Sequence, residues 1–598
     1  MKILNEYRSL LPYLSRYKYS YIIGVFCLVI VDAAQIVIPQ FIRLAIDMIT
    51  GDNFQWNRII ILSLWMTGVM ALVCVGRFLW RYFINGSSRR IETELRERLF
   101  AHLQKLSWDF YQKNKIGDLM ARSINDLHAV RMSIGMGLVA LFDFVFMATA
   151  ILIIIFIQDA NSAIVSIIPL PLVTLLILIF GGIVGKKFRA VQETYSKMSD
   201  NAQETFAGIS VIKSFAKEWW FLKKFADSND DYREANMELA RLFGFFFPFV
   251  SFLSGLTILI MLAVGGARVV NGEMTAGSLV AMFRYLNMLI WPLMGAGFMV
   301  NMIQRGAVSL GRVNAILNTA PSIANGAEGV SDSRSGKIAD INPLSPVSNS
   351  PVIELSNLEF SYNNDDKVLE NISLKIERGE WLGVMGRTGS GKSTLIKTLT
   401  RMVDPPRGTA RVFGHDVREW PLDSLRGFFA VCPQDSYLFS DTIANNIAYG
   451  LETADMEKLD MAVSFASLNK DLEIFQSGRN TVIGERGLTL SGGQKQRTAI
   501  ARAIIMNAEI LILDDSLSAV DNETERKILE ALRRERINRA TIIVSHRVST
   551  LKYADNVLVL DKGKILEYGS PANLIDAGGF FSKMAAFQRL ERQESDNG

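Results

Sequence analysis

The sequence predicts a multidomain protein in which a six-helix all-α transmembrane domain precedes an α/β domain built around a phosphate-binding loop. Hydrophobic residues make up 49% of the 598 residues and the mean hydropathy is positive, which is typical of membrane proteins. Apolar stretches of spanning length recur up to about residue 304, and a glycine-rich loop near residue 390 joins a short apolar run to a helical pattern. Together these features predict both halves of the fold.

The six expected spans cover residues 19–42, 57–84, 134–158, 161–185, 243–267 and 275–304. About 20 apolar residues cross a hydrocarbon core of about 30 Å, so each stretch is long enough. None alternates with a period of two over about 10 residues, so helices are favoured over a membrane β-barrel. The alternative, buried helices of a large soluble protein, would need all six runs to lie inside one core.

The connections between the spans predict the topology. Those near residues 85–133 and 186–242 are long and polar, and the first is rich in Lys and Arg, whereas the other loops are short and poor in positive charge. By the positive-inside rule, the long connections, both termini and the second domain are cytoplasmic, in a multi-pass protein of the cell inner (plasma) membrane. Within these connections, WDFYQKNKIGDL and VIKSFAKEWW read as short transverse helices or as solvated loops; we expect the former, with interface anchors Phe110, Tyr111, Phe215 and Trp219.

Three charged residues fall near the middle of predicted spans, Asp32, Asp143 and Arg284. An ionised group at that depth costs about 2.5–3.5 kcal/mol on insertion scales, so such residues face a bundle interior or a water-filled cavity. We expect Arg284 to neutralise one of the acids. The alternative makes a carboxylate a subsite for cationic, lipophilic substrates.

The remaining composition excludes several classes of protein. The net charge of +4 is too small to indicate a nucleic-acid partner, and three cysteines and four histidines, far apart in sequence, form no disulfide or metal pattern. The first apolar run is long and lacks a small-residue cleavage site, so we expect a retained span. Residues 318–351, rich in Ser, Pro, Gly and Asn, read as a linker between a transmembrane domain at 1–317 and a nucleotide-binding domain at 352–598.

The segment GRTGSGKS, from Gly386 to Ser393, matches the phosphate-loop pattern. Its glycines let backbone N–H groups wrap phosphates, and the helix that follows favours their negative charge at its N-terminus. We expect Lys392 to reach the β- and γ-phosphates and Ser393 to ligate Mg²⁺, with Asp514, at the end of the buried run ILILD, as the second Mg²⁺ partner. The pattern therefore predicts a nucleoside triphosphatase. Its loop and the start of its helix comprise Gly386, Arg387, Thr388, Gly389, Ser390, Gly391, Lys392, Ser393 and Thr394.

A second glycine-rich segment, LSGGQKQR at residues 490–497, places a serine and two glycines at an apparent helix start, which is an anion-binding arrangement. With the phosphate loop, the Asp514 strand and His546 after TIIVS, it resembles the signature of ATP-binding-cassette proteins. The resemblance covers nearly the whole chain, because six spans with two long cytoplasmic connections precede one cassette. The chain is similar to one half of an ATP-binding-cassette exporter of the multidrug and lipid-flipping type.

This resemblance implies roles for further residues. Tyr362 in FSY would stack on adenine, Gln434 in CPQD would contact Mg²⁺ and sense the membrane domain, and His546 would contact the γ-phosphate. The segment GERG, residues 484–487, would face the transverse helices, and residues 518–521 would form the D-loop. The signature residues that would serve the partner's ATP are Ser491, Gly492, Gly493 and Gln494.

In this family two cassettes enclose two ATP molecules head to tail, and hydrolysis separates them to drive alternating access and efflux of lipophilic compounds or drugs. The implied partners are therefore a second half-transporter, the lipid bilayer and a small lipophilic substrate, with ATP and Mg²⁺ as cofactors. The residue after the strand aspartate is usually a catalytic glutamate, but here it is Asp515, whose carboxylate reaches about 1.5 Å less far. We therefore expect slow hydrolysis at the site with Asp515, Gln434 and His546, and a heterodimer whose second subunit supplies the glutamate.

Several alternatives stay open at this stage. A homodimer that works with aspartate would need no special partner. Lipid flipping and peptide export are further transport functions, although no peptidase-like segment with a catalytic cysteine precedes the first span. A cassette protein that gates a channel or regulates a transporter would keep every motif. The six spans argue against a soluble cassette ATPase that acts on ribosomes or DNA.

Overall fold

The computed structural model describes residues 6–51, 55–167, 169–323, 344–362, 366–451, 453, 455–484 and 490–596. The chain forms two compact units. The membrane unit comprises Met1–Leu106 with Asn114–Ala320, and the cassette unit comprises Ser107–Lys113 with Pro321–Gly598. Each is described by itself.

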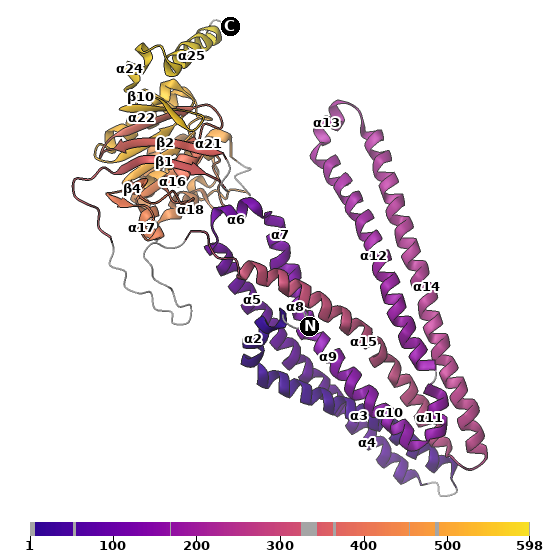
Figure 1. Ribbon diagram of the computed structural model, residues 1–598. Helices are drawn as coiled ribbons and strands as arrows, with labels where there is room; N and C mark the ends of the chain where they lie inside the picture. The colour runs from indigo at the N-terminus through magenta and orange to yellow at the C-terminus, as the bar shows by residue number, and fades with distance from the viewer. Residues whose placement is uncertain are drawn as a thin grey trace. The chain divides into compact units, whose positions relative to one another are not determined.

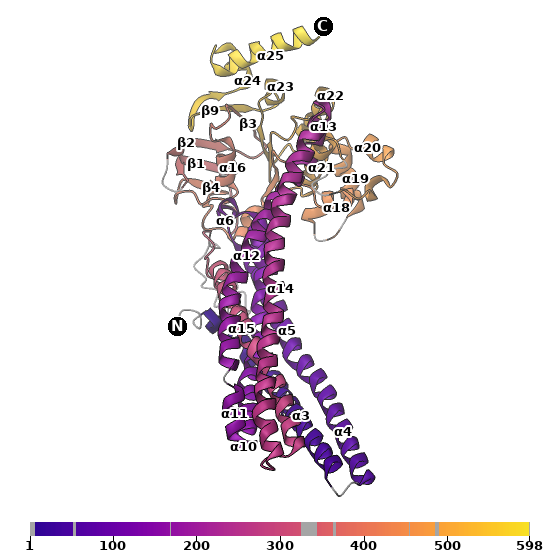
Figure 2. The ribbon, with the colours of Figure 1, turned by 90° about the vertical axis from the view of Figure 1, so that its right-hand side faces the viewer.

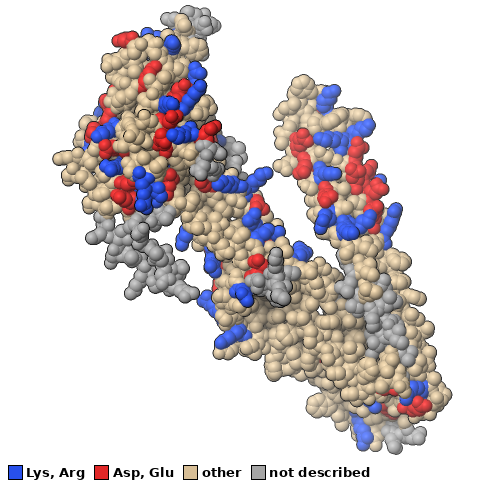
Figure 3. Space-filling view, in the orientation of Figure 1, with Lys and Arg blue, Asp and Glu red and all other residues tan. Residues whose placement is uncertain are grey.

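Five described helical segments are long and apolar enough to cross a membrane: Lys18–Thr50, Trp56–Lys105, Ile116–Gln158, Glu218–Val270 and Ala276–Leu317. They correspond to α3 (Lys18–Thr50), α4–α5 (Trp56–Trp80 and Gly86–Lys105), α7–α10 (Ile116–Ala121 to Thr149–Gln158), α14 (Glu218–Val270) and α15 (Ala276–Leu317). The fourth predicted span falls on α11 (Ala160–Ile167) and α12 (Pro169–Ala207), on either side of residue 168, which lies outside the described residues. Figure 3 shows few charged side chains over the surface of the spanning part.

Helices α12 and α14 run side by side as a long antiparallel hairpin, joined at its tip by the short α13 (Ile209–Ser214) (Figure 1). Charged side chains gather near this tip (Figure 3). The tip also carries two large exposed aromatic side chains, Phe215 (71% exposed) and Trp219 (72% exposed). We refer to α12–α14 as the hairpin arm. The long connection at residues 186–242 is thus helical, as its sequence pattern predicts.

The cassette unit contains two sheets. The larger has the order β10-β9-β3-β8-β7-β6, and its five strands from β9 to β6 are parallel. Their bounds are β3 Trp381–Gly386, β6 Phe429–Cys432, β7 Ile510–Asp514, β8 Ala540–Val544, β9 Asn556–Asp561 and β10 Lys564–Gly569. The smaller, antiparallel sheet has the order β2-β1-β4-β5, from β1 (Ile353–Ser361), β2 (Lys367–Ile376), β4 (Ala410–Val412) and β5 (His415–Asp416).

Both faces of the larger sheet are buried, which explains why its strands read as continuous apolar runs. On β3, Leu382 and Val384 pack in the core beneath the smaller sheet, whereas Trp381 and Met385 pack in the core with the helices. Those helices include α18 (Ile443–Ile447), α19 (Met456–Phe465), α20 (Asn469–Ile474), α21 (Gly492–Ile505) and α22 (Asn522–Glu535). Figure 2 shows α18–α20 grouped apart from β1 and β2.

Candidate nucleotide site

The chemistry-bearing residues meet at one edge of the larger sheet. The adjacent strands β3, β8, β7 and β6 are parallel, so their carboxyl ends lie together. The phosphate loop follows β3, His546 follows β8, and Asp514 ends β7 while Gln434 follows β6. Ligands of open α/β sheets bind outside the carboxyl ends of the strands. This edge is therefore the candidate site.

The phosphate loop has the backbone that its glycines predict. Gly389 and Gly391 have φ angles of +81° and +103°, a region that only glycine adopts at little cost. A Cβ at Gly391 would lie 2.8 Å from Leu369, so the close packing of the loop against β2 also requires glycine there. Helix α16 (Lys392–Leu399) begins directly after Gly391, and its free N–H groups form an anion-binding end.

Lys392 spans this loop. Its Nζ donates to the carbonyl oxygens of Gly386 at 2.7 Å and Arg387 at 3.0 Å. Burial lowers the pKa of Lys392, and the charges of Asp514 and Asp515 oppose that shift. Among the described residues, the Lys392 ammonium donates to these two backbone carbonyls, and phosphate oxygens would offer it stronger, charged acceptors.

The two adjacent carboxylates have different surroundings. Burial raises the pKa of Asp514, and the neighbouring charge of Asp515 raises it further, while Lys392 lowers it. Burial also raises the pKa of Asp515, against the opposing charge of His546 and then Arg547. The structure thus brings the strand acid, the residue in the catalytic position and the predicted switch histidine within electrostatic reach of one another.

The backbone of Asp515 is held in an unusual conformation. Its φ of +46° lies in the left-handed region, in which Asp is several-fold enriched over most other residues. Its N–H donates to the Val544 carbonyl at 2.9 Å, and its own carbonyl accepts from Ser518 Oγ at 2.9 Å. The main chain at this position is therefore fixed on both sides, and the reach of the carboxylate is set by its side chain alone.

Most other predicted contacts lie at the same edge. The hydroxyls of Tyr362 and Thr394 are 3.3 Å apart, which places the predicted adenine-stacking ring beside α16. Ser390 Oγ is buried and has no hydrogen-bond partner among the described residues. By contrast, the structure leaves several predicted site residues exposed at the site surface, namely Arg387, Thr388, Ser393, Gln434 and His546.

The donors at this edge fit a magnesium ion. Mg²⁺ prefers oxygen ligands and is usually held by one or two carboxylates together with substrate phosphates and water. Asp514 and the exposed hydroxyl of Ser393 offer such oxygens next to the loop. Among the described residues there is no group of three or more His, Cys, Asp or Glu that could hold a metal by itself. A metal here would therefore depend on bound phosphate.

The signature segment forms a separate surface of the cassette. Ser491 caps α21 in a reciprocal capping box, with Ser491 N–H donating to Gln494 Oε1 at 2.9 Å and Gln494 N–H to Ser491 Oγ at 3.3 Å. Gln494 Nε2 donates to Asp471 at 3.0 Å, and Arg497 forms an ion pair with the same carboxylate at 2.7 Å. The glycines Gly492 and Gly493 form the first turn. In the described part of the chain these contacts run to α20 and not to the phosphate loop.

Sequence reasoning missed the residues that hold the predicted D-loop, residues 518–521. Gln496 Nε2 donates to Ser518 Oγ at 3.0 Å, and Gln496 Oε1 accepts from Ala519 N–H at 2.8 Å. Arg547, next to His546, donates to the Ser518 carbonyl at 2.7 Å and to Glu525 at 2.6 Å. No motif spacing marks these pairs, because they join segments more than 20 residues apart. The predicted GERG loop falls largely on residues 485–489, outside the described residues, as does much of the linker at 324–343.

One predicted transverse helix belongs to the cassette unit. Residues 108–113 form α6, and the Nζ of Lys397 on α16 lies 3.8 Å from the centre of the Trp108 ring. Phe110 and Tyr111 pack edge to face at 5.5 Å and are partly exposed. Trp108, which sequence reasoning did not single out, thus contacts the helix of the phosphate loop. Phe215 and Trp219 lie on the hairpin arm.

The membrane charges differ from expectation. Arg284 is exposed, and among the described residues the cation that acts on Asp32 and Asp143 is Arg77, so the expected pairing with Arg284 is corrected. Instead, Asp143 and Arg77 lie within electrostatic reach of Asp32. Arg77 donates to Gln35 at 3.1 Å. Sequence position did not reveal Arg77, because it lies nearer the end of its predicted span.

Both acids carry a buried carboxylate oxygen without a hydrogen-bond partner among the described residues, and Asp32 is only 3% exposed. Asp143 also lines an apolar cavity of about 250 Å³. The wall of this cavity includes the aromatic side chains of Trp291 and Phe298. The membrane unit therefore contains an apolar pocket with one acidic residue, Asp143, in its lining.

Comparisons with known proteins cover both units. The family described as ABC transporter transmembrane region matches residues 21–293, and the family described as ABC transporter matches residues 369–518. The chain is 34% identical over 576 residues to the probable multidrug resistance ABC transporter ATP-binding/permease protein YheI of Bacillus subtilis, with 96% of each chain covered. It is 34% identical over 578 residues to the multidrug resistance-like ATP-binding protein MdlA of Escherichia coli, covering 96% of this chain and 95% of that protein.

Two further similarities extend the comparison. An ATP-dependent lipid A-core flippase of Syntrophus aciditrophicus is 34% identical over 507 residues, which is 84% of this chain and 81% of the flippase. A solved structure, titled as a bacterial Atm1-family ABC exporter with ATP bound, superposes with a TM-score of 0.77 at 26% identity, covering 96% of this chain and 99% of that one. The predicted fold class, a helical membrane domain followed by a P-loop ATPase domain, is confirmed.

Proposed function

Because the chain belongs to the ABC transporters and carries their membrane region and ATPase domain in one polypeptide, we propose that it is one subunit of a heterodimeric exporter of lipophilic compounds. It is a multi-span membrane protein with a cytoplasmic ATPase domain, and ATP binding and hydrolysis drive its transport. The heterodimer, the slow site and the class of cargo are the parts that we propose.

The main support for the heterodimer is Asp515 in the position of the expected glutamate. A carboxylate in this position can polarise the attacking water only if it reaches it, and the fixed backbone of Asp515 leaves its shorter side chain no compensation. We assign ATP binding at this site to Tyr362, Lys392 and the loop backbone, with Ser393, Gln434 and Asp514 holding Mg²⁺. When bound, Mg²⁺ would neutralise charge on the β- and γ-phosphates.

The signature segment supports the same proposal of one slow and one efficient ATP site. Its capping box is complete and its glycines are intact, so it is suited to complete the ATP site of a partner subunit. The pair would then have one site that holds ATP for long periods and one that hydrolyses it efficiently. Closure across the two nucleotides is favourable only while γ-phosphates bridge the halves, so one efficient site is enough to reopen the pair.

The cargo is inferred from the membrane unit. The pocket lined by Asp143, Trp291 and Phe298 is apolar apart from its acid. Such a pocket suits a lipophilic compound, and its unpartnered carboxylate oxygen favours one with a positive charge. Two relatives named for multidrug resistance support export of such compounds.

Lipid flipping is the second candidate, because a relative of similar identity is named as a lipid A-core flippase. A homodimer, a peptide exporter and a channel regulator are less well supported. Transport in inverted vesicles distinguishes these functions. We expect ATP-dependent accumulation of lipophilic cationic dyes. Movement of fluorescent lipid alone would favour flipping, and absence of any accumulation would favour regulation.

The subunit composition has a direct test. The chain would be tagged, purified from its native membrane, and its companions identified by mass spectrometry. We expect a second half-transporter with Glu after its strand aspartate, in equal amount. Recovery of this chain paired only with itself, with vigorous ATPase activity, would overturn the heterodimer.

A further inference from the structure

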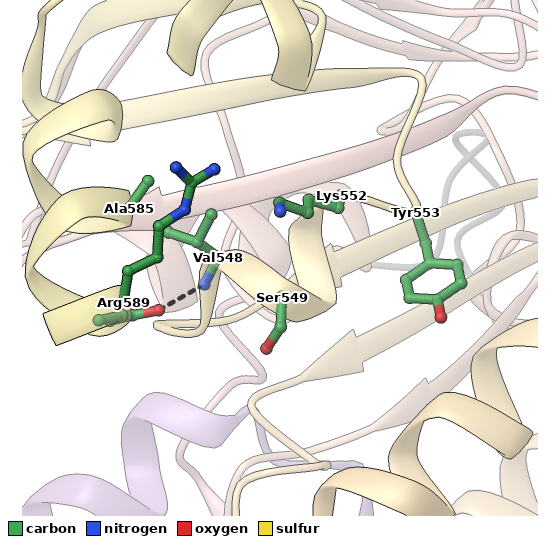
Figure 4. Close-up of a pocket in the computed structure, with 7 residues that line it drawn as sticks. Val548, Ser549, Lys552, Tyr553, Ala585 and Arg589 are labelled. Carbon is green, nitrogen blue, oxygen red and sulfur yellow. Dashed lines mark hydrogen bonds between the residues drawn. The ribbon is translucent and has the colours of Figure 1, made fainter. Parts of the chain in front are cut away.

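The C-terminal helix α25 (Phe580–Asp596) connects two loops of the nucleotide site that are distant in sequence. Gln588 Nε2 donates to the carbonyl oxygen of His546 at 2.7 Å, and Gln588 Oε1 accepts from the Val548 N–H at 2.9 Å. One side-chain amide therefore satisfies backbone groups on both sides of Arg547. Figure 4 shows the hydrogen bond to Val548 at the edge of a cavity between α25 and α23 (Val548–Leu551).

Helix α25 is itself anchored firmly at its N-terminal end. Phe581 is fully buried in the core with the helices, and Ala585, one turn later, packs in the same core. The carboxylate of Glu567 on β10 accepts from the N–H groups of Phe580 and Phe581. The position of Gln588 is thus set by the sheet and by the core.

The same helix contacts the phosphate loop. The guanidinium of Arg387 lies over the Phe580 ring, with its central carbon 5.6 Å from the ring centre. Phe580 and Gln588 are two turns apart on α25, so the first contacts the loop after β3 and the second contacts the loop after β8. Both loops carry residues that we assign to the phosphates of ATP, Lys392 in one and His546 in the other.

We propose that α25 braces these two loops and that Gln588 is a positioning residue for His546, which acts on the γ-phosphate. This inference rests on the nucleotide site of the proposed function and adds a part that none of its motifs contains. His546 is exposed, its carbonyl oxygen accepts from Gln588 Nε2, and the N–H of the next residue, Arg547, donates to Ser545 Oγ at 3.0 Å. Without the amide, the imidazole would lose its orientation while the loop around the other phosphates would persist.

The affinities for ATP and for ADP separate this role from a general effect on the fold, because only ATP has a γ-phosphate. Loss of one hydrogen bond to a charged group lowers affinity by roughly 10- to 140-fold. We expect Gln588→Ala to weaken ATP binding by about 10-fold and to leave ADP binding within about 2-fold. Measured with a non-hydrolysable ATP analogue, these values do not depend on whether the site hydrolyses ATP quickly, so slow hydrolysis is tested separately from the brace.

Four further variants complete the experiment on the purified full-length chain. Gln588→Met keeps the size of the side chain and removes both hydrogen bonds, so it should behave like Gln588→Ala. Lys583→Ala, on an exposed part of α25, is the matched control and should change neither affinity. In a His546→Ala background, Gln588→Ala should add no further loss, because residues that act through each other are not additive.

The proposal is overturned if Gln588→Ala weakens ATP and ADP equally, since the helix then supports the whole domain and not the histidine. It is also overturned if Gln588→Met binds ATP like wild type, since packing then suffices. Additive losses in the double variant, or an unchanged ATP-to-ADP ratio in His546→Ala, would have the same consequence. Slow or fast turnover of the wild-type chain leaves each of these outcomes interpretable.

Discussion

Replacing Asp515 by glutamate should speed hydrolysis at the site that we propose to be slow. The substitution restores one methylene, about 1.5 Å of reach, toward the water that attacks the γ-phosphate. In the structure the main chain of Asp515 is held by hydrogen bonds of 2.9 Å on both its N–H and its carbonyl. A shift of the backbone toward the water would break these hydrogen bonds, so the shorter side chain is expected to act on the chemistry.

The size of the effect follows from this geometry. A misplacement of about 1 Å can cost about 100-fold in rate, and a well-placed general base contributes about 10²–10⁴-fold. We expect Asp515→Glu to raise the hydrolysis rate at this site by about 10- to 100-fold, which is about 1.4–2.7 kcal/mol of barrier. Because Asp tolerates the left-handed φ of +46° better than most residues, the variant should also melt at a slightly lower temperature.

Single-turnover hydrolysis of γ-labelled ATP by the purified chain alone measures this rate. Asp515→Gln is the matched control, because it has the length of glutamate and lacks its charge. It should show no gain. Asp515→Asn, with the length of aspartate, should stay near wild type if the aspartate already fails as a base. The reasoning is refuted if Gln gains as much as Glu, or if wild type alone turns over at about 1 s⁻¹ or faster and Glu adds nothing.

Three other predictions follow from the described contacts. Burial raises the pKa of Asp514, so its ionisation favours the unfolded state as pH rises above the ordinary pKa of about 4. Without nucleotide, Asp514→Asn should therefore melt at a higher temperature than wild type at pH 7 and at a similar temperature near pH 4. The variant should also lose the extra stabilisation by Mg²⁺ and ATP. Trp108→Ala should reduce transport per ATP hydrolysed several-fold while ATP binding persists. Trp108→Phe, which keeps a ring over Lys397, should stay near wild type. An equal loss of ATP binding would contradict a coupling role. Asp143→Asn should lower the preference for tetraphenylphosphonium over the uncharged tetraphenylsilane about 10-fold in a binding assay, and an unchanged preference would exclude the acid as a cation subsite.

The spans and the phosphate loop were predictable because each depends on residues that are neighbours in the sequence. A run of about 20 apolar residues crosses a bilayer, and the loop from Gly386 to Ser393 needs its glycines at fixed spacing. The contacts of Arg77 were not predictable in this way. Which face of a span points at Asp32 depends on how each helix is rotated about its axis, and the sequence does not state that rotation.

The supporting residues of the site follow the same rule. Gln496, Arg547 and Gln588 each hold a loop that lies 22 to 42 residues away in sequence. None of them belongs to a sequence motif of the nucleotide site, and glutamine and arginine are common on protein surfaces. The packing of α21 and α25 against the sheet brings Gln496 and Gln588 to their loops, and Arg547 reaches the Ser518 carbonyl from the loop after β8.

The hairpin arm has a consequence for the life of this protein in the cell. Its tip carries Phe215 and Trp219 with most of their surfaces exposed, and exposed aromatic surface of this kind attracts other proteins. A copy that has not yet assembled would offer these side chains to chaperones and proteases. If the proposed heterodimer is right, the amount of this chain that survives should therefore follow the supply of the second half-transporter.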